Sequence, residues 1–293
     1  MLWYLAMRLV IALRFPPFPW EPRLMRRSRI SPIVATTILI CLSGCASLQN
    51  ALLYHPSPLP GEPGPTANRA QEVVLRAAGD LSICAWWYPC DVAKGALLFC
   101  HGNGGNLADW GGFAESLGRR LDQSVLIFDY PGYGRSSGTP DERGCYAAGT
   151  AAFDWLVQVR EYRPEQIVIY GESLGGGVAL ELATRRPHRA LCLVRTFTSI
   201  PDMAREVFPL LPMQWLVTDQ FDNLKKIEQI AGPVFIAHGT ADQLIPYAHS
   251  QRLFAAAGKP RRFFPMQGMG HNDPLPPEFF ASLRQFLNAY APL

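Results

Sequence analysis

Short runs of apolar residues recur along the body of the chain and alternate with longer stretches whose apolar residues repeat at the helical period. Runs of this length are typical of buried strands. They predict strands at residues 72–77, 81–88, 96–100, 124–129, 167–170, 191–196, 234–238 and 262–265. The longer stretches predict helices at about residues 107–121, 142–160, 174–186, 247–257 and 277–291.

Strands that alternate with amphipathic helices indicate an α/β fold, with a mostly parallel sheet covered by helices on both faces. The first two strands flank Gly79 and Asp80, so we expect them to form an antiparallel pair. Residues 199–230 interrupt the alternation with Pro209, Pro212 and many aromatic and aliphatic residues. We expect these residues to form a small helical lid (the lid segment), whose apolar side chains either line an acyl pocket or pack onto the body.

The N-terminal part of the chain has a different pattern. A basic stretch after Met25 precedes an apolar run at residues 33–42, which is too short to span a bilayer but suits a signal peptide. The run ends in Leu-Ser-Gly followed by Cys45, which resembles the lipobox of bacterial lipoproteins. We therefore expect a signal peptide at residues 1–44, a lipidated Cys45, a Pro-rich tether at residues 45–70 and a folded domain at residues 71–293.

Two alternatives for the N-terminus stay open. The apolar run could belong to an ordinary signal peptide or to a short anchor helix with an incidental cysteine, and translation could start at Met25. Ala46 follows Cys45, and in a Gram-negative cell this resembles the type sorted to the outer membrane. We expect a lipid-anchored protein of the bacterial cell envelope, on the outer membrane and facing the periplasm.

Composition fits a globular protein with a large core, since 48% of residues are hydrophobic and 17% are charged. The net charge of +3 comes from residues 1–44, which carry a net +5, whereas the remainder carries a net −2. The sequence therefore gives no reason to expect a nucleic-acid partner. The cysteines lack metal-ligand spacing. A disulfide bridge between Cys84 and Cys90 stays an alternative in an oxidising compartment.

Candidate chemistry begins at the Gly-Glu-Ser-Leu-Gly motif of residues 171–175, which follows a predicted strand and opens a predicted helix. That context suits a nucleophile elbow, in which a sharp turn exposes Ser173 at the end of the strand. Alternatively, Ser173 simply caps the helix, or the glycines bind phosphate. The motif lacks the Lys-Ser/Thr of a P-loop and the G-x-G-x-x-G spacing, which disfavours the phosphate site.

A serine nucleophile needs a base, and the base needs a group that orients it. His271 lies in a glycine-flanked loop after the last strand, and Asp242 lies just past the preceding strand. The order Ser173, Asp242, His271 is that of the α/β-hydrolases. The backbone N–H groups of Leu174 and of Asn103, in the glycine-dense loop 101–106, are candidates for the oxyanion hole.

Four segments in this order closely resemble the α/β-hydrolase fold: residues 101–106, 129–136, 171–176, and 238–242 with 270–271. The branch with short lids, which includes serine-aminopeptidase-like hydrolases and membrane-associated protein depalmitoylases, looks nearest. The resemblance covers about residues 71–291. It implies an eight-stranded sheet with Ser173, Asp242 and His271 as nucleophile, acid and base, and gives residues 129–136 a structural role.

These observations favour a membrane-tethered serine hydrolase that cleaves an ester, thioester or amide through an acyl-enzyme. We expect a small-molecule or acylated substrate, with lipid-like substrates favoured, contact with the membrane through the N-terminal lipid, and no cofactor. The competing hypothesis is a non-catalytic lipoprotein that uses the hydrolase fold as a binding module.

Overall fold

The computed structural model describes residue 50 and residues 53–57, 70–210 and 217–293. Internal contacts divide the chain into residues 1–41 and residues 42–293, and all of the first unit lies outside the described residues. The predicted signal peptide, Met25 and the lipidation site Cys45 also fall outside them, as do residues 211–216 of the lid segment. Those expectations stay predictions.

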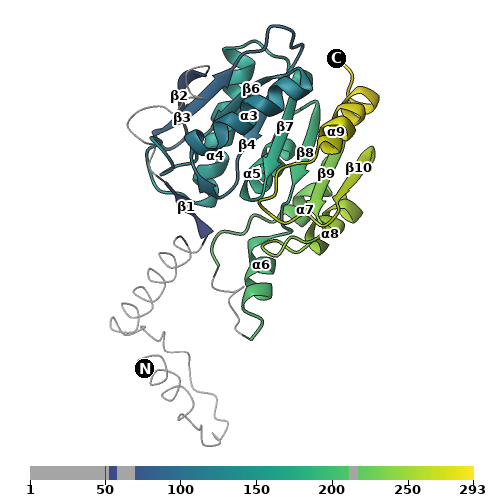
Figure 1. Cartoon of the computed structure of the whole chain (residues 1–293). Coiled ribbons are helices and arrows are strands. Elements are labelled where there is room, and N and C mark those ends of the chain that lie inside the picture. The colour runs from purple at the N-terminus through teal and green to yellow at the C-terminus, as the bar shows by residue number, and fades with distance from the viewer. Residues whose placement is uncertain (1–49, 51–52, 58–69, 211–216) are drawn as a thin grey trace, which may run out of the picture. The chain divides into compact units, whose positions relative to one another are not determined.

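The core of the second unit is one eight-stranded sheet (Figure 1). Its strand order is β10-β9-β8-β7-β4-β6-β3-β2, and only β3 runs against the others, because it pairs antiparallel with both β2 and β6. The strands are β2 (Gln71–Ala77), β3 (Leu81–Tyr88), β4 (Ala96–Cys100), β6 (Ser124–Phe128), β7 (Ile167–Glu172), β8 (Ala190–Val194), β9 (Val234–Gly239) and β10 (Arg261–Met266).

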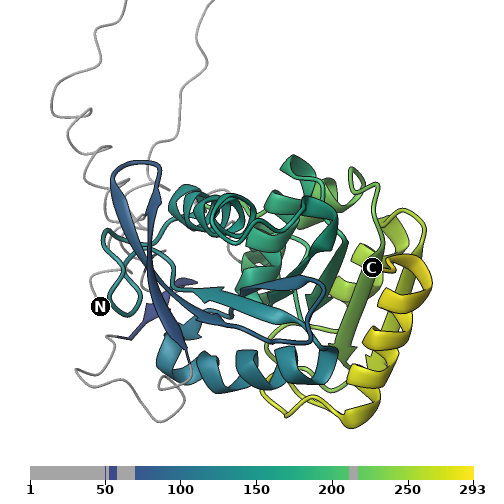
Figure 2. The same ribbon diagram turned by 90° about the horizontal axis from the view of Figure 1, so that it is seen from above.

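Helices cover both faces of this sheet (Figure 2). The larger ones are α3 (Leu107–Leu121), α4 (Glu142–Gln158), α5 (Leu174–Arg185), α8 (Ala248–Ala256) and α9 (Pro277–Tyr290). Buried residues of α4, α5 and α8 form one core cluster, and those of α3 and α9 form the other. The α/β-hydrolase fold predicted from the sequence is confirmed, and each predicted strand or helix bound lies within about two residues of the observed one.

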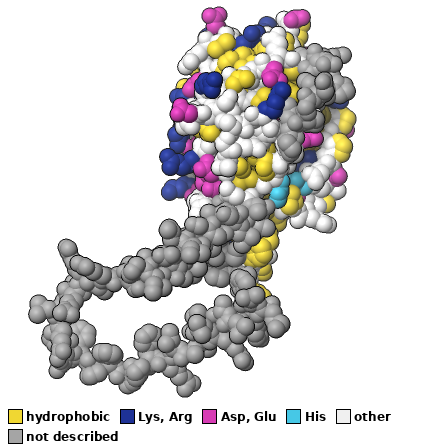
Figure 3. Space-filling view, turned by 90° about the vertical axis from the view of Figure 1, so that its left-hand side faces the viewer, with side chains coloured by type: hydrophobic (Ala, Val, Ile, Leu, Met, Phe, Trp, Pro, Cys, Tyr) yellow, Lys and Arg dark blue, Asp and Glu magenta, His cyan; other side chains and the backbone are white. Residues whose placement is uncertain are grey.

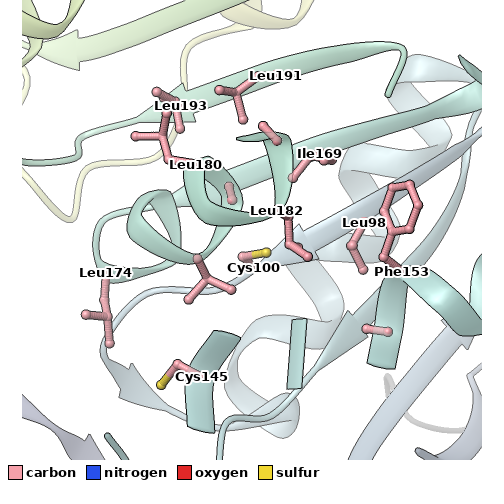
Figure 4. Packing of buried hydrophobic residues seen from close by; sticks show 14 of the residues in the cluster. Leu98, Cys100, Cys145, Phe153, Ile169, Leu174, Leu180, Leu182, Leu191 and Leu193 are labelled. Atoms are coloured by element: carbon pink, nitrogen blue, oxygen red, sulfur yellow. The ribbon is translucent and has the colours of Figure 1, made fainter. Parts of the chain in front are cut away.

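Alternation along the central strand explains how two cores form on one sheet. Leu98 of β4 packs into the cluster under α4 and α5, whereas its neighbours Leu97 and Phe99 pack into the cluster under α3 and α9. Successive side chains of a strand point to opposite faces, so a strand buried on both faces reads as a continuous apolar run. Figure 4 shows the first cluster, in which Leu98 and Cys100 meet Phe153 of α4 and leucines of α5.

Two smaller features lie at the carboxyl edge of the sheet. Within the lid segment, the structure describes α6 (Ile200–Val207) and α7 (Asn223–Ile227) between β8 and β9. The two-residue strands β1 (His55–Pro56) and β5 (Gly104–Gly105) pair in parallel, so part of the expected tether lies against the loop after β4. The sequence did not predict this pairing.

The cysteines of the body stay unpaired. All five are free thiols: Cys84, Cys90, Cys100, Cys145 and Cys192. The structure therefore shows no disulfide bridge between Cys84 and Cys90. Burial raises the pKa of Cys84 to about 11, with smaller contributions from nearby carboxylates. A thiol of this kind is inert near neutral pH.

Candidate active site

Ser173 stands at the sharp turn between β7 and α5. Its backbone φ is +53° and its ψ is −118°, a conformation that non-glycine residues rarely adopt and that is typical of strained functional turns. Its N–H donates to the Val194 carbonyl at 2.9 Å, and the hydroxyl of Thr196 donates to its carbonyl at 2.8 Å. Its side chain makes no capping hydrogen bond to α5, which disfavours the simple helix-cap interpretation.

The glycines of the motif allow this turn because the backbone around it is crowded. A Cβ on Gly175 would lie 2.0 Å from the carbonyl oxygen of Cys100, at the end of the adjacent strand β4. A Cβ on Gly171 would lie 2.5 Å from the carbonyl oxygen of Gly175. Both distances are far inside van der Waals contact, so side chains at these positions would push the turn away from the sheet.

His271 and Asp242 meet Ser173 from the two neighbouring strand ends. The Nε2 atom of His271 lies 3.1 Å from Ser173 Oγ, and its Nδ1 lies 2.7 Å from Asp242 Oδ2. Both separations are within hydrogen-bond reach, and they join residues 98 and 29 positions apart in the sequence. The structure therefore brings the three predicted residues together in the order hydroxyl, imidazole, carboxylate.

Asp242 is held by more partners than the sequence suggested. Its Oδ1 accepts the backbone N–H groups of Leu244 and Ile245, each at 2.9 Å, and His238 Nε2 lies 3.2 Å from its Oδ2. Burial by itself would raise the pKa of Asp242, but hydrogen bonds from His238, His271 and Ile245 outweigh it and hold the pKa well below its usual range. The carboxylate is therefore ionised at neutral pH, as a group that orients an imidazole must be.

The loop after β4 lies beside Ser173. Asn106 caps α3 by accepting the Ala108 N–H at 2.8 Å, while Asp109 accepts the Asn106 N–H at 3.0 Å, which together form a capping box. The side-chain oxygen of Asn103 accepts the Tyr133 hydroxyl at 2.9 Å and the His55 N–H at 3.2 Å. Residues 129–136 thus support the loop through Tyr133, and β1 supports it through His55.

The two candidate oxyanion donors lie on different elements, one at the start of α5 and one in the loop after β4. Leu174 is the first residue of α5, where a backbone N–H has no partner within the helix. Asn103 lines the same cavity as Ser173. A developing oxyanion between these two residues would also lie at the positive end of the α5 dipole.

Replacing Asn103 with alanine is expected to lower kcat about tenfold with little change in KM. The substitution keeps the backbone N–H but removes the oxygen that fixes the loop to Tyr133 and His55. Steady-state kinetics on a short-chain ester will measure it, with Tyr133→Phe as the milder companion. Unchanged kcat in the alanine variant would show that these two contacts do not position the loop.

A buried ion pair beneath the site was missed from the sequence. Arg195, just after β8, places Nη1 3.4 Å from Glu172 Oε1 and donates from Nη2 to the Asp273 carbonyl at 2.5 Å. The Tyr170 hydroxyl donates to the other oxygen of Glu172 at 3.1 Å. Burial raises the pKa of Glu172, and Arg195 opposes that shift. Arg195 therefore connects the residue before Ser173 to the loop that carries His271.

Replacing Arg195 with methionine is expected to lower the free energy of unfolding by about 3 kcal/mol, because Glu172 is left buried without its cation. It is also expected to lower kcat about tenfold, since the His271 loop loses a bond. Urea unfolding and ester kinetics will measure both. Glu172→Gln added to the variant should recover part of the stability. Arg119→Met, which removes the exposed partner of Glu115, should change stability by less than about 0.5 kcal/mol.

A cavity of about 520 Å³ opens over Ser173. Its polar rim includes His55, Asn103 and His271. Its apolar wall comes from α3, α9 and two loops, namely Trp110, Phe113, Leu244, Leu275 and Phe280. None of the described residues of the lid segment lines this cavity. The structure therefore does not show their apolar side chains in the first of the two expected roles, which was to line an acyl pocket.

Neither a metal-binding cluster nor a membrane-spanning helix occurs in the parts of the chain that the structure describes. Residues 50, 53–57, 70–210 and 217–293 contain no group of three or more His, Cys, Asp or Glu side chains placed to hold a metal ion. No helix within the same ranges is long and apolar enough to cross a bilayer.

Comparison with known proteins agrees with this fold. A family profile described as the alpha/beta hydrolase fold matches residues 95–218. An uncharacterized protein of Mycobacterium tuberculosis is 35% identical over 260 residues, which are 85% of this chain and 91% of that protein. The human alpha/beta hydrolase domain-containing protein 17B is 38% identical over 199 residues, 67% of each chain.

Solved structures share the fold at lower identity. An esterase of Pyrococcus furiosus superposes with a TM-score of 0.65 at 17% identity, covering 82% of this chain and 98% of that one. The identity is too low to carry more than the fold. The M. tuberculosis and human relatives are similar enough over enough of their length to place the chain, which belongs to the α/β-hydrolase family.

Proposed function

We propose that this hydrolase cleaves an ester, thioester or amide bond through an acyl-enzyme formed on Ser173. The observation that carries the proposal is the chain of contacts from Ser173 Oγ to His271 Nε2 at 3.1 Å and from His271 Nδ1 to Asp242 Oδ2 at 2.7 Å. A hydroxyl in this setting can transfer its proton to the imidazole as it attacks a carbonyl carbon. A non-catalytic binding module would have no need of the strained turn that exposes Ser173.

The proposed reaction has two stages. Ser173 Oγ attacks the carbonyl carbon while its proton moves to His271 Nε2, and the N–H groups of Leu174 and Asn103 stabilise the oxyanion. The tetrahedral intermediate collapses as His271 protonates the leaving alcohol, thiol or amine. A water molecule then attacks the acyl-enzyme by the same route, which releases the carboxylic acid and restores the Ser173 hydroxyl.

The shape of the cavity favours an acyl chain as the substrate portion next to the scissile bond. Trp110, Phe113 and Phe280 give it an apolar wall. Both basic side chains of its lining already have partners, since Arg195 pairs with Glu172 and Arg120 lies over the Phe280 ring. A panel of p-nitrophenyl esters and acyl thioesters of increasing chain length, beside aminoacyl amides, will test this. We expect kcat/KM to rise with chain length, and amides alone being cleaved would contradict the preference.

We further propose that Cys45 is lipidated and holds the protein on the outer membrane of a bacterial cell, facing the periplasm. Support comes from the basic, apolar and Leu-Ser-Gly-Cys segments that precede the folded unit. Metabolic labelling with an alkyne fatty acid will test it. We expect wild-type protein to take up the label and Cys45→Ala to lose it, whereas equal labelling would place the lipid elsewhere.

A further inference from the structure

Apolar side chains cluster on the surface at the end of α6. Leu210 is 94% exposed, Val207 is 61% exposed and Phe208 is also exposed. Elsewhere in the described parts of the chain, exposed large hydrophobic side chains occur singly along the sequence. In Figure 3, hydrophobic side chains protrude at the lower end of the described body, which is the end where Figure 1 places α6. A group of this kind marks an interaction surface more often than a scattered residue does.

Charged side chains of α6 form ion pairs within the protein. Asp202 pairs with Arg205 of the same helix at 3.1 Å and with Arg252 of α8 at 3.0 Å. The helix is therefore fixed through its polar side, while Val207, Phe208 and Leu210 are exposed. A helix with one polar side bound and an apolar end exposed suits contact with the boundary between lipid headgroups and acyl chains.

The N-terminal chain contacts the same end of the body through a segment that we call the arm, which comprises residue 50 and residues 53–57. The Tyr54 hydroxyl donates to Asp219 Oδ2 at 2.6 Å, and Asp219 belongs to the lid segment. The Tyr54 side chain is buried, and Asn50 Nδ2 donates to the Pro140 carbonyl at 3.2 Å. His55 pairs with Gly104 in the loop beside Ser173.

These bonds limit the distance between the folded body and the proposed lipid on Cys45. Asn50 lies five positions after Cys45, so a fully extended chain between them spans at most about 18 Å. The arm, α6 and the loop of residues 101–106 all follow or contact the carboxyl ends of the parallel strands, the edge where Ser173 lies. A lipid on Cys45 would therefore hold this edge close to the bilayer.

We propose that the phospholipid bilayer is the partner of this surface, and that Val207, Phe208 and Leu210 enter it. The inference rests on the proposed lipidation of Cys45 and on the proposed role of Ser173. In this orientation the cavity, whose rim includes His55 of the arm, opens beside the membrane. The enzyme would take the acyl chain of its substrate from the bilayer that anchors it.

The position of the surface can be tested without catalysis. The full-length lipidated Ser173→Ala, Cys90→Ser chain will be placed in vesicles of phosphatidylethanolamine and phosphatidylglycerol, with an environment-sensitive fluorophore at Leu210→Cys. We expect lipids brominated on their acyl chains to quench this label. The same label at Val92→Cys, which is 72% exposed and precedes the amino end of β4, should not be quenched. Equal quenching at the two positions would overturn the proposal.

The consequence for turnover needs the active chain. Val207→Glu with Leu210→Glu is expected to lower turnover of a long-chain fluorogenic ester held in the same vesicles about tenfold, and to leave turnover of a soluble short-chain ester unchanged. Val92→Glu is the matched control and should change neither. Unchanged turnover of the vesicle substrate in the double variant would contradict the proposal. If Ser173→Ala keeps activity while Leu210 is still quenched, the proposed catalytic role fails and the membrane surface stands.

Discussion

Replacing Ser173 with alanine is expected to lower kcat by at least about 10⁴-fold, to the rate left by substrate binding and the oxyanion donors alone. The substitution removes the hydroxyl oxygen that lies 3.1 Å from His271 Nε2, in a position to attack a carbonyl. It leaves the turn intact, since the backbone bonds from Ser173 to Val194 and Thr196 do not use the side chain hydroxyl. Ester hydrolysis measured with enzyme in excess will show the loss.

Ser282→Ala is the matched control, because Ser282 lies on α9 and does not line the cavity. It should keep wild-type kcat and Tm. The Ser173 variant should keep wild-type Tm while losing activity. An alanine variant that keeps a tenth or more of the wild-type kcat, an order-of-magnitude threshold, would show that another residue is the nucleophile.

Replacing Asp242 with asparagine is expected to lower kcat about 10³- to 10⁴-fold. The carboxylate accepts four hydrogen bonds, from His238, His271 and two backbone N–H groups, and an amide cannot accept at both of its ends. The imidazole of His271 would lose the partner that fixes its tautomer. Because the pKa of Asp242 is held well below its usual range, this carboxylate stays ionised above about pH 5.

A matched substitution separates this effect from loss of fold. Asp222→Asn changes a half-buried residue that caps α7, and it should leave kcat unchanged. In the wild-type protein, a fall in rate between about pH 7 and pH 5 cannot come from Asp242, whose pKa is lowered. The stability that its ionised form contributes is lost only as pH falls further, through the lowered pKa. Near-normal kcat in the Asp242 variant would remove this residue from the proposed mechanism.

Much of the fold follows from local patterns in the sequence. Apolar runs such as residues 96–100 and 167–172 form strands that are buried on both faces. These strands therefore do not alternate apolar with polar residues. The Gly79–Asp80 turn joins an antiparallel pair as expected, with both residues at positive φ. The elbow at Ser173 was recognisable because a strand, a glycine-flanked turn and a helix follow one another within one short segment.

Features that depend on distant pairs were not predictable in this way. The contact of His55 with the loop at Asn103 joins residues 48 positions apart, and no local pattern marks it. The bond from Arg195 to the Asp273 carbonyl spans 78 positions and depends on how β8 and β10 are ordered in the sheet. The apolar wall of the cavity likewise comes from α3 and α9, which the sequence shows only as amphipathic helices.

Peptide mapping by mass spectrometry after reaction with a fluorophosphonate tests the central claim most directly. The reagent forms a covalent adduct with a serine hydroxyl that is activated by a neighbouring base, and the modified residue is read from the fragment masses. We expect one adduct, on Ser173, that forms much more slowly in the Asp242→Asn variant. An adduct on another residue, or none on a protein that hydrolyses esters, would contradict the assignment of Ser173 as the nucleophile.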